Sequence, residues 1–229
     1  MIFDVLTLFP ELINSHMNFS IMKRAVEDGI IEVHTIDPRD YTLDKHRKVD
    51  DTPYGGGAGM VLAPQPYIDA YESVKVEGKS ITVMMTPQGE PYNDTLSNEL
   101  AGYDQIIILC GHYEGFDERI REIIKPREIS IGDFVLTGGE LPALCLIDSI
   151  SRKIEGTLGK IESAHDDSFS DGLLEYPQYT KPREYRGLRV PEVLLNGNHK
   201  LIEEYRFEQK IKRTKEKRPD LWEKWSKNN

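Results

Sequence analysis

The stretch Ile129–Ala143, ISIGDFVLTGGELPA, joins a glycine-rich turn to a mostly apolar helical segment. Gly132, Gly138 and Gly139 have no Cβ atom, so the backbone at these positions can lie against a flat ligand. The stretch therefore predicts a binding loop that leads into a core helix. The alternative is a turn that only shapes the start of this helix, with Glu140 favouring the helix dipole.

A second loop of similar character spans Leu109–Ile120, LCGHYEGFDERI. Here the apolar strand QIIILC at residues 105–110 breaks at Gly111, and a helix is expected to start near Phe116. Loops that follow neighbouring parallel strands meet at one edge of a sheet. The two loops therefore predict one shared pocket.

Short apolar strands alternate with helical segments through the first part of the chain. The expected strands are IFDVLTLF at 2–9, IIEVHTI at 30–36, SITVMM at 80–85 and QIIILC at 105–110. Helices are expected from Pro10 to Gly29, from Pro64 to Val76 and from Asn93 to Ala101. This alternation predicts an α/β fold, a parallel sheet with helices on both faces.

The alternating pattern fails after Arg152. Residues 156–172, GTLGKIESAHDDSFSDG, are polar and rich in glycine and serine, which predicts a flexible linker between domains. The sequence thus divides into a first domain at 1–155, the linker at 156–172 and a small helical domain at 173–229. The expected core positions of the small domain include Leu201, Tyr205 and Ile211.

Composition limits the class of protein. The 229 residues are 38% hydrophobic, which is enough for a sizeable core. Cys110 and Cys145 both lie in apolar runs without metal-ligand spacing, so both are expected to be buried free thiols in a reducing compartment. The N-terminal stretch MIFDVLTLFPELI has no basic region before its apolar residues. A cytoplasmic protein without membrane contact is therefore expected.

Charge is unevenly distributed along the chain. The net charge of −10 argues against nucleic-acid binding by the summed field. Two basic clusters oppose this trend and are candidates for phosphate contacts; they are Lys181, Arg183, Arg186 and Arg189, and Lys210, Lys212, Arg213, Lys215, Lys217 and Arg218. The alternative for each cluster is a solvated helix face.

Common nucleotide-binding motifs are absent from the sequence. No strand is followed by GxGxxG, and neither GxxxxGK[ST] nor the GxSxG of α/β-hydrolases occurs. GGGAG at residues 55–59 follows the polar VDDTPY and not an apolar strand, so it is a poor phosphate loop. A nucleotide-dependent oxidoreductase or kinase is therefore disfavoured.

Five segments in fixed order resemble the bacterial tRNA (guanosine-37-N1)-methyltransferases, the TrmD family of the knotted SPOUT class. They are LTLFPE at 6–11, KHRKVDDTPYGGGAGM at 45–60, MTPQG at 85–89, LCGHYEGFDERI at 109–120 and ISIGDFVLTGGELPA at 129–143. The resemblance spans nearly the whole chain. It implies S-adenosylmethionine as methyl donor, a homodimer with active sites at the subunit interface, and a trefoil knot in the first domain, although connections are rarely knotted.

The resemblance further implies that loops after three strands hold the donor. By motif match, the donor-binding residues are Thr86, Pro87, Gly111, Tyr113, Glu114, Gly115, Ile131, Gly132, Phe134, Leu136, Gly138, Gly139 and Pro142. Relatives often have Tyr at the position of Phe134, so ring stacking is kept here without a phenol. Tyr113 and Glu114 offer a ring face and a carboxylate to a sulfonium cation. The alternative for Glu114 is an acid near a helix N-terminus.

Two residues are implied in catalysis. Asp167, in HDDSF, is the expected general base that removes the guanine N1 proton, with the neighbouring Asp166 as the competing candidate. An exposed aspartate is a weak base, so this role requires burial or a nearby negative charge. Arg152 is expected to stabilise negative charge on guanine O6. An ion pair with Asp148, four residues earlier, is the alternative for Arg152.

Contacts with tRNA are implied in two places. The segment Lys45–Lys48, with Asp50, Asp51 and the glycines at 55–59, is similar to the family's loop near the target base. Asp50 either accepts a hydrogen bond from a guanine edge or caps its own turn. The helical domain is expected to bind the anticodon arm. No metal ligands are predicted, the sequence leaves a role for magnesium open, and an RNA-binding module without catalysis is the competing class.

Overall fold

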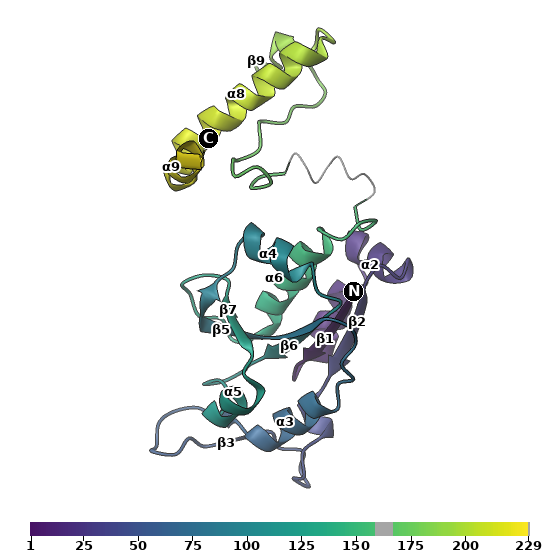
Figure 1. Ribbon diagram of the computed structural model, residues 1–229, viewed down its shortest axis with the longest axis vertical. Helices are drawn as coiled ribbons and strands as arrows, with labels where there is room; N and C mark the ends of the chain where they lie inside the picture. Colours follow the sequence, from purple (N-terminus) through teal and green to yellow (C-terminus); the bar gives the residue numbers. More distant parts are fainter. Residues whose placement is uncertain (159–166, 229) are drawn as a thin grey trace. The chain divides into compact units, whose positions relative to one another are not determined.

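Five parallel strands form a sheet in the order β2-β1-β6-β5-β7 (Figure 1). Their bounds are β1 Ile2–Leu6, β2 Glu32–Ile36, β5 Ser80–Pro91, β6 Gln105–Cys110 and β7 Arg127–Ser130. All six residues of β6, the middle strand, are buried. A continuous apolar run suits a strand that is covered on both faces. The predicted parallel α/β fold is confirmed.

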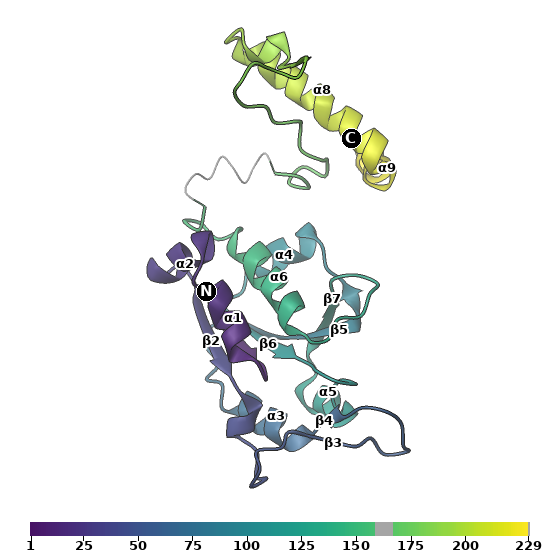
Figure 2. The ribbon, with the colours of Figure 1, turned by 180° about the vertical axis from the view of Figure 1, so that it is seen from behind.

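Helices cover both faces of this sheet (Figure 2). Side chains alternate along β6, so that Ile106 and Ile108 belong to one core cluster, and Ile107 and Leu109 to the other. The first cluster is closed by α1 Pro10–His16, α2 Ser20–Glu27, α4 Asp94–Leu100 and α6 Glu140–Ser151; the second is closed by α3 Pro64–Glu72 and α5 Glu118–Ile124. Smaller elements on the second side are η1 Pro38–Asp40, β3 Asp50–Asp51 and β4 Val61–Leu62.

The helix predicted from Pro10 to Gly29 is two helices. α1 ends at His16, and the backbone of Phe19 is extended, with φ −121° and ψ 143°, before α2 begins. Asn18 and Ser20 flank this break, and their side chains compete with the helix for backbone hydrogen bonds. The apolar period alone did not reveal the interruption.

β5 is longer than the predicted strand at residues 80–85. Its pairing with β7 shifts register, because Met85 and Glu90 both oppose Ile129. The four residues at 86–89 therefore bulge from the ladder. This bulge places the MTPQG segment at the edge of the sheet where β6 and β7 end.

The two cysteines have different environments. Cys110 is buried, as predicted, but Cys145 is exposed, so the prediction for Cys145 is wrong. α6 turns Ala143, Leu146 and Ile147 toward the sheet, and Cys145 lies on the other side of the helix. Burial, aided by the nearby charge of Glu140, raises the pKa of the Cys110 thiol well above its ordinary value.

The structure is a computed structural model that describes residues 1–158 and 167–228, in two compact units, Met1–Gly159 and Lys160–Asn229. The middle of the predicted linker, with Asp166, lies outside the described residues. Within the described ranges, every helix is too short or too polar to cross a membrane.

The second unit contains helices and one small hairpin. Its elements are β8 Glu184–Tyr185, β9 Leu188–Arg189, η2 Glu192–Leu194, α8 His199–Lys217 and α9 Pro219–Asn228. An all-helical domain was predicted, so the hairpin is a correction. Arg186 and Gly187 form its turn with φ 50° and 80°, the left-handed pair that a two-residue hairpin turn requires.

Packing in the second unit differs from the predicted core. Leu201 is 43% exposed, whereas Lys210 and Thr214 on α8 are buried. Lys210 forms an ion pair with Asp171, and the Thr214 hydroxyl accepts a hydrogen bond from the main-chain N–H of Leu174 at 2.9 Å. Lys210 therefore stabilises the fold, although its basic run was interpreted as a set of phosphate contacts.

Candidate active site

A pocket of about 300 Å³ opens where β6 and β7 end and β5 bulges. All of the predicted donor-binding residues line it: Thr86, Pro87, Gly111, Tyr113, Glu114, Gly115, Ile131, Gly132, Phe134, Leu136, Gly138, Gly139 and Pro142. The single pocket predicted from the two glycine-rich loops is confirmed. It lies at the carboxyl ends of parallel strands, where α/β folds bind ligands.

The two loops predicted to share the pocket are joined through their backbones. The N–H of Gly139 donates to the carbonyl of Gly111 at 2.8 Å. A Cβ atom on Gly139 would lie 2.8 Å from the Cα of Cys110 and 2.9 Å from the nitrogen of Gly111. Only glycine allows this approach, because the neighbouring atoms belong to the backbone and cannot move aside.

The segment resembling the family's target-base loop packs against the pocket loop that contains Glu114. The N–H of Glu114 donates to the carbonyl of Met60 at 3.0 Å, and the N–H of Leu62 donates to the carbonyl of Gly115 at 2.9 Å. The Glu114 carboxylate packs against Gly59, where a side chain would overlap it. Two segments that are distant in sequence thus meet at Glu114. An acid that only favoured a helix N-terminus would not need this contact.

Tyr113 links the same two segments. Its backbone adopts a left-handed conformation with φ 56°, which is unusual for an aromatic residue and is typical of functional sites. Partial burial and the charge of Asp50 raise the pKa of the Tyr113 phenol, which is hydrogen-bonded to the Asp50 carboxylate. Asp50, in the segment that resembles the target-base loop, thus accepts a hydrogen bond from the pocket residue Tyr113.

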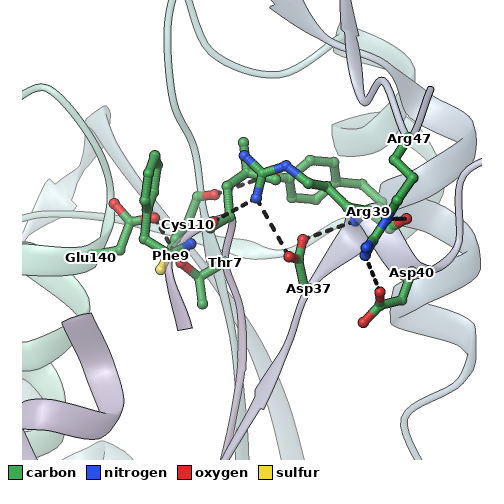
Figure 3. Close-up of polar contacts among 10 residues, drawn as sticks. Thr7, Phe9, Asp37, Arg39, Asp40, Arg47, Cys110 and Glu140 are labelled. Atoms are coloured by element: carbon green, nitrogen blue, oxygen red, sulfur yellow. Dashed lines mark hydrogen bonds and ion pairs between the residues drawn. The ribbon is translucent and has the colours of Figure 1, made fainter. Parts of the chain in front are cut away.

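A buried carboxylate, that of Glu140, lies close to Thr7 (Figure 3). Glu140 is 3% exposed and accepts a hydrogen bond from the Thr7 hydroxyl at 2.8 Å. Its other oxygen lies 3.4 Å from Nε2 of His112, and the His112 ring packs 4.7 Å from the ring of Phe9. The sequence predicted only a helix-dipole role for Glu140, but its carboxylate connects β1 to the pocket loop that contains His112.

Some residues of the pocket were not among those to which the resemblance assigns a donor contact. They are Met85, Gln88, His112, Phe116, Arg121, Ile129, Ser130, Val135 and Thr137. Arg121 pairs with Glu118 at 3.0 Å and Glu128 at 3.2 Å, so its charge is compensated. His112 and Phe116 lie inside the quoted LCGHYEGFDERI motif, and that motif was the available signal for them.

The basic segment Lys45–Lys48 is exposed. Within it, Arg47 forms an ion pair with Asp40 (Figure 3). The carboxylate of Asp44 accepts hydrogen bonds from the main-chain N–H groups of His46 and Lys48, which lower the pKa of Asp44. The segment is thus held as a turn with its basic side chains at the surface.

Arg152 lies far from the pocket of its own chain. It caps the C-terminal end of α6, whereas Gly139 and Pro142 lie at the other end of this helix. Twelve residues of α-helix span about 18 Å. Asp148, the alternative partner of Arg152, lies 3.8 Å from Nε2 of His16.

Asp167 belongs to the second unit. It is half-buried, and its main-chain carbonyl accepts a hydrogen bond from the Ser170 hydroxyl at 2.8 Å. Neither predicted catalytic residue lines the pocket described above. Among residues 1–158 and 167–228, no group of three or more His, Cys, Asp and Glu side chains is arranged to hold a metal ion.

The pocket suits a nucleoside-sized ligand with a positive charge. Its glycine-lined backbone leaves room where side chains would intrude, and the rings of Tyr113 and Phe134 offer flat faces. The carboxylate of Glu114 lies in its wall, and that of Glu140 lies behind it. Fold and pocket together define an α/β protein that binds such a ligand at the ends of its strands.

Comparison with known proteins identifies the family. The model of the tRNA (guanine-1)-methyltransferase family TrmD matches residues 1–224. The chain is 56% identical over 226 residues to a tRNA (guanine-N(1)-)-methyltransferase of Clostridioides difficile (strain 630), covering 97% of each chain. It is 55% identical over 222 residues to the Staphylococcus aureus (strain JH9) enzyme of the same name, covering 97% of this chain and 91% of that one. The chain belongs to the TrmD family of methyltransferases, a class that uses S-adenosylmethionine as methyl donor.

Proposed function

We propose that the chain transfers a methyl group from S-adenosylmethionine to N1 of guanosine 37 in tRNA. The observation that carries this proposal is the gathering of every predicted donor-binding residue around one pocket in a member of the TrmD family. We infer a cytoplasmic location from the tRNA substrate.

The pocket residues bind and orient the donor, which supplies a methyl group on a sulfonium centre. The ring faces of Tyr113 and Phe134 and the carboxylate of Glu114 favour a cation over a neutral molecule. Backbone N–H and C=O groups around Gly111 and Gly139 contact the flat part of the ligand, because no side chain lies between them and the ligand. Glu140 holds His112 in place from behind.

Guanine N1 carries a proton that must leave when the nitrogen attacks the methyl carbon. Asp167 is proposed as the general base that accepts this proton. Arg152 donates hydrogen bonds toward guanine O6 and stabilises the negative charge that grows there.

A homodimer explains the position of Arg152. The guanidinium is at the end of α6 opposite the pocket, and about 18 Å of helix separates the two. An arginine side chain does not bridge that length, so Arg152 is proposed to act in the pocket of a partner subunit. Asp167 is proposed to act in the same partner pocket.

A trefoil knot is also proposed, and one crossing supports it. β5 lies between β6 and β7 in the sheet, yet Gly139, on the loop that leaves β7, contacts the end of β6. The loop therefore crosses the point where the chain leaves β5 at residues 86–89. Such a crossing is one of those that a knotted connection needs.

Methyl transfer to defined transcripts tests the proposed function. Tritium from labelled S-adenosylmethionine is expected in tRNA transcripts with guanosine at position 37 and not in transcripts with adenosine there. Nuclease digestion should give N1-methylguanosine. Binding of tRNA without any transfer would favour an RNA-binding module and contradict the proposal.

Complementation between two impaired variants tests the shared site. Arg152→Met removes the arginine, and Gly139→Ala weakens donor binding, so methyl transfer is measured at a donor concentration well below the Kd of the Gly139→Ala pocket. Random pairing makes half of the dimers mixed, and each mixed dimer has one complete site if Arg152 acts across the interface. Co-expressed variants are therefore expected to show about a quarter of wild-type activity.

The matched control pairs Arg152→Met with Asp167→Asn. Both residues of one chain are proposed to serve the same partner pocket, so no site in the mixed dimer is complete and no activity should return. Recovery in this control, or none with Gly139→Ala, would show that the subunits do not share their sites as proposed.

A further inference from the structure

The second unit contains a cavity of about 430 Å³ that the methyl-transfer chemistry does not use. Residues 176–181 and Arg183 line it, together with Val190, Leu194, Leu195, Ile202 and Arg206. Cavities of this size hold ligands as large as a nucleotide. The residues come from a loop, the η2 turn and α8, all within one unit.

The floor of this cavity combines an aromatic ring with a guanidinium group. Tyr176 is 6% exposed, and Cζ of Arg206 lies 4.6 Å from the centre of its ring. Nε of Arg206 is buried and has no hydrogen-bond partner among the described residues. A buried donor without a partner is costly, so this N–H favours a ligand that accepts a hydrogen bond.

Apolar and aromatic surface continues from the floor to the rim. Leu194, Leu195 and Ile202 are half-buried and give the cavity an apolar wall. Tyr179 also lines the cavity and lies beside Tyr205, whose pKa is raised by burial and by Tyr179. These surfaces suit the face of a planar ring.

Charge points to an anionic ligand. Lys181, Arg183 and Arg206 line the cavity, and none of its lining residues is acidic, although the whole chain carries a net charge of −10. By contrast, Arg189 on the neighbouring hairpin is paired with Glu184 at 2.7 Å. A local excess of cations around an aromatic and apolar floor is the combination that single-stranded nucleic acid requires.

We propose that this cavity holds one unstacked nucleotide of the tRNA substrate, distinct from the methylated guanosine. The base packs against the apolar wall and the Tyr176–Arg206 pair, and the flanking phosphate contacts Lys181 and Arg183. The proposal rests on the proposed function only in taking tRNA as the substrate. In this proposal the second unit contacts one particular nucleotide of the tRNA, in addition to a general electrostatic contact with the phosphates.

A substitution that fills the cavity tests this inference. Ile202→Trp places an indole in the space, while Leu201→Trp adds the same ring one residue away at a 43% exposed position outside the cavity lining. Dissociation constants for tRNA are measured by filter binding at one salt concentration. Ile202→Trp is expected to weaken binding about tenfold or more, since base stacking contributes that much. Leu201→Trp should bind like wild type.

A scan of transcripts that each lack one base of the anticodon arm identifies the nucleotide. The wild-type protein is expected to lose affinity sharply at one position other than 37, and Ile202→Trp should show no further loss at that position. Arg206→Met, a second variant that adds no bulk, should show the same positional pattern. Circular dichroism melting checks that the variants are folded.

The outcomes separate this inference from the proposed function. Wild-type affinity in Ile202→Trp, or a loss spread evenly over all positions, would overturn the nucleotide pocket even if guanosine 37 is methylated. A sharp positional loss without methyl transfer would leave the pocket standing and contradict the enzymatic proposal.

Discussion

Asp167→Asn is expected to lower kcat for methyl transfer by about 10²–10⁴-fold. The amide keeps the size and most hydrogen bonds of the carboxylate but cannot take a proton from guanine N1. Binding of S-adenosylmethionine should be unchanged, because the proposed partner of Asp167 is guanine N1 and not the donor. Single-turnover transfer with saturating donor and tRNA measures the chemical step, and calorimetry measures donor binding.

Asp171→Asn is the matched control, four residues further along the same segment. Its carboxylate pairs with Lys210 on α8, so the substitution should reduce stability and leave kcat nearly unchanged. Full activity in Asp167→Asn would move the general base elsewhere, first to Asp166. Equal losses of kcat in both variants would mean that the segment supports catalysis by its folded structure and that Asp167 is not the proton acceptor.

Gly139→Ala is expected to weaken donor binding about 10- to 100-fold, through overpacking of about 1–3 kcal/mol. The new methyl group would lie 2.8 Å from the Cα of Cys110 and 2.9 Å from the nitrogen of Gly111. The backbone of one loop must then move away from the other, and the hydrogen bond between Gly139 and Gly111 is lost. Titration calorimetry with S-adenosylmethionine measures the effect.

Gly102→Ala serves as the control, because the nearest atom to its added Cβ is the Glu99 carbonyl oxygen at 3.2 Å and the residue is not part of the pocket. It should bind the donor with wild-type affinity. Thermal melting of both variants separates a local change from unfolding. Normal donor affinity in a folded Gly139→Ala would show that the close contact of the two loops is not needed for binding.

Sequence patterns predicted the features that depend on local chemistry. The apolar run at residues 105–110 predicted a strand of a sheet covered on both faces, and the glycines of its following loop predicted the pocket. Features that depend on residues distant in the sequence were not predicted. Glu140 is buried because Thr7, 133 residues away, donates to it, and no local pattern shows that contact.

The same distinction holds elsewhere in the chain. The exposure of Cys145 depends on which side of α6 faces the sheet. The hairpin turn was not predicted because its left-handed residue is Arg186, and the sequence there lacks the Asn-Gly pair that is typical of such turns. The cavity beside α8 went unrecognised because Lys181 and Arg183 were judged by charge alone and Arg206 was not singled out. Its aromatic floor is formed only when the loop containing Tyr176 folds onto the helix.

The contact between Thr7 and Glu140 limits how this enzyme can be shortened. Every residue that lines the donor pocket lies between Met85 and Pro142, so a fragment beginning at β5 would contain the complete lining. It would lack Thr7 and leave the carboxylate of Glu140 without the hydroxyl that satisfies it. The donor pocket is therefore contiguous in sequence but not autonomous, and the opening strand is an integral part of it.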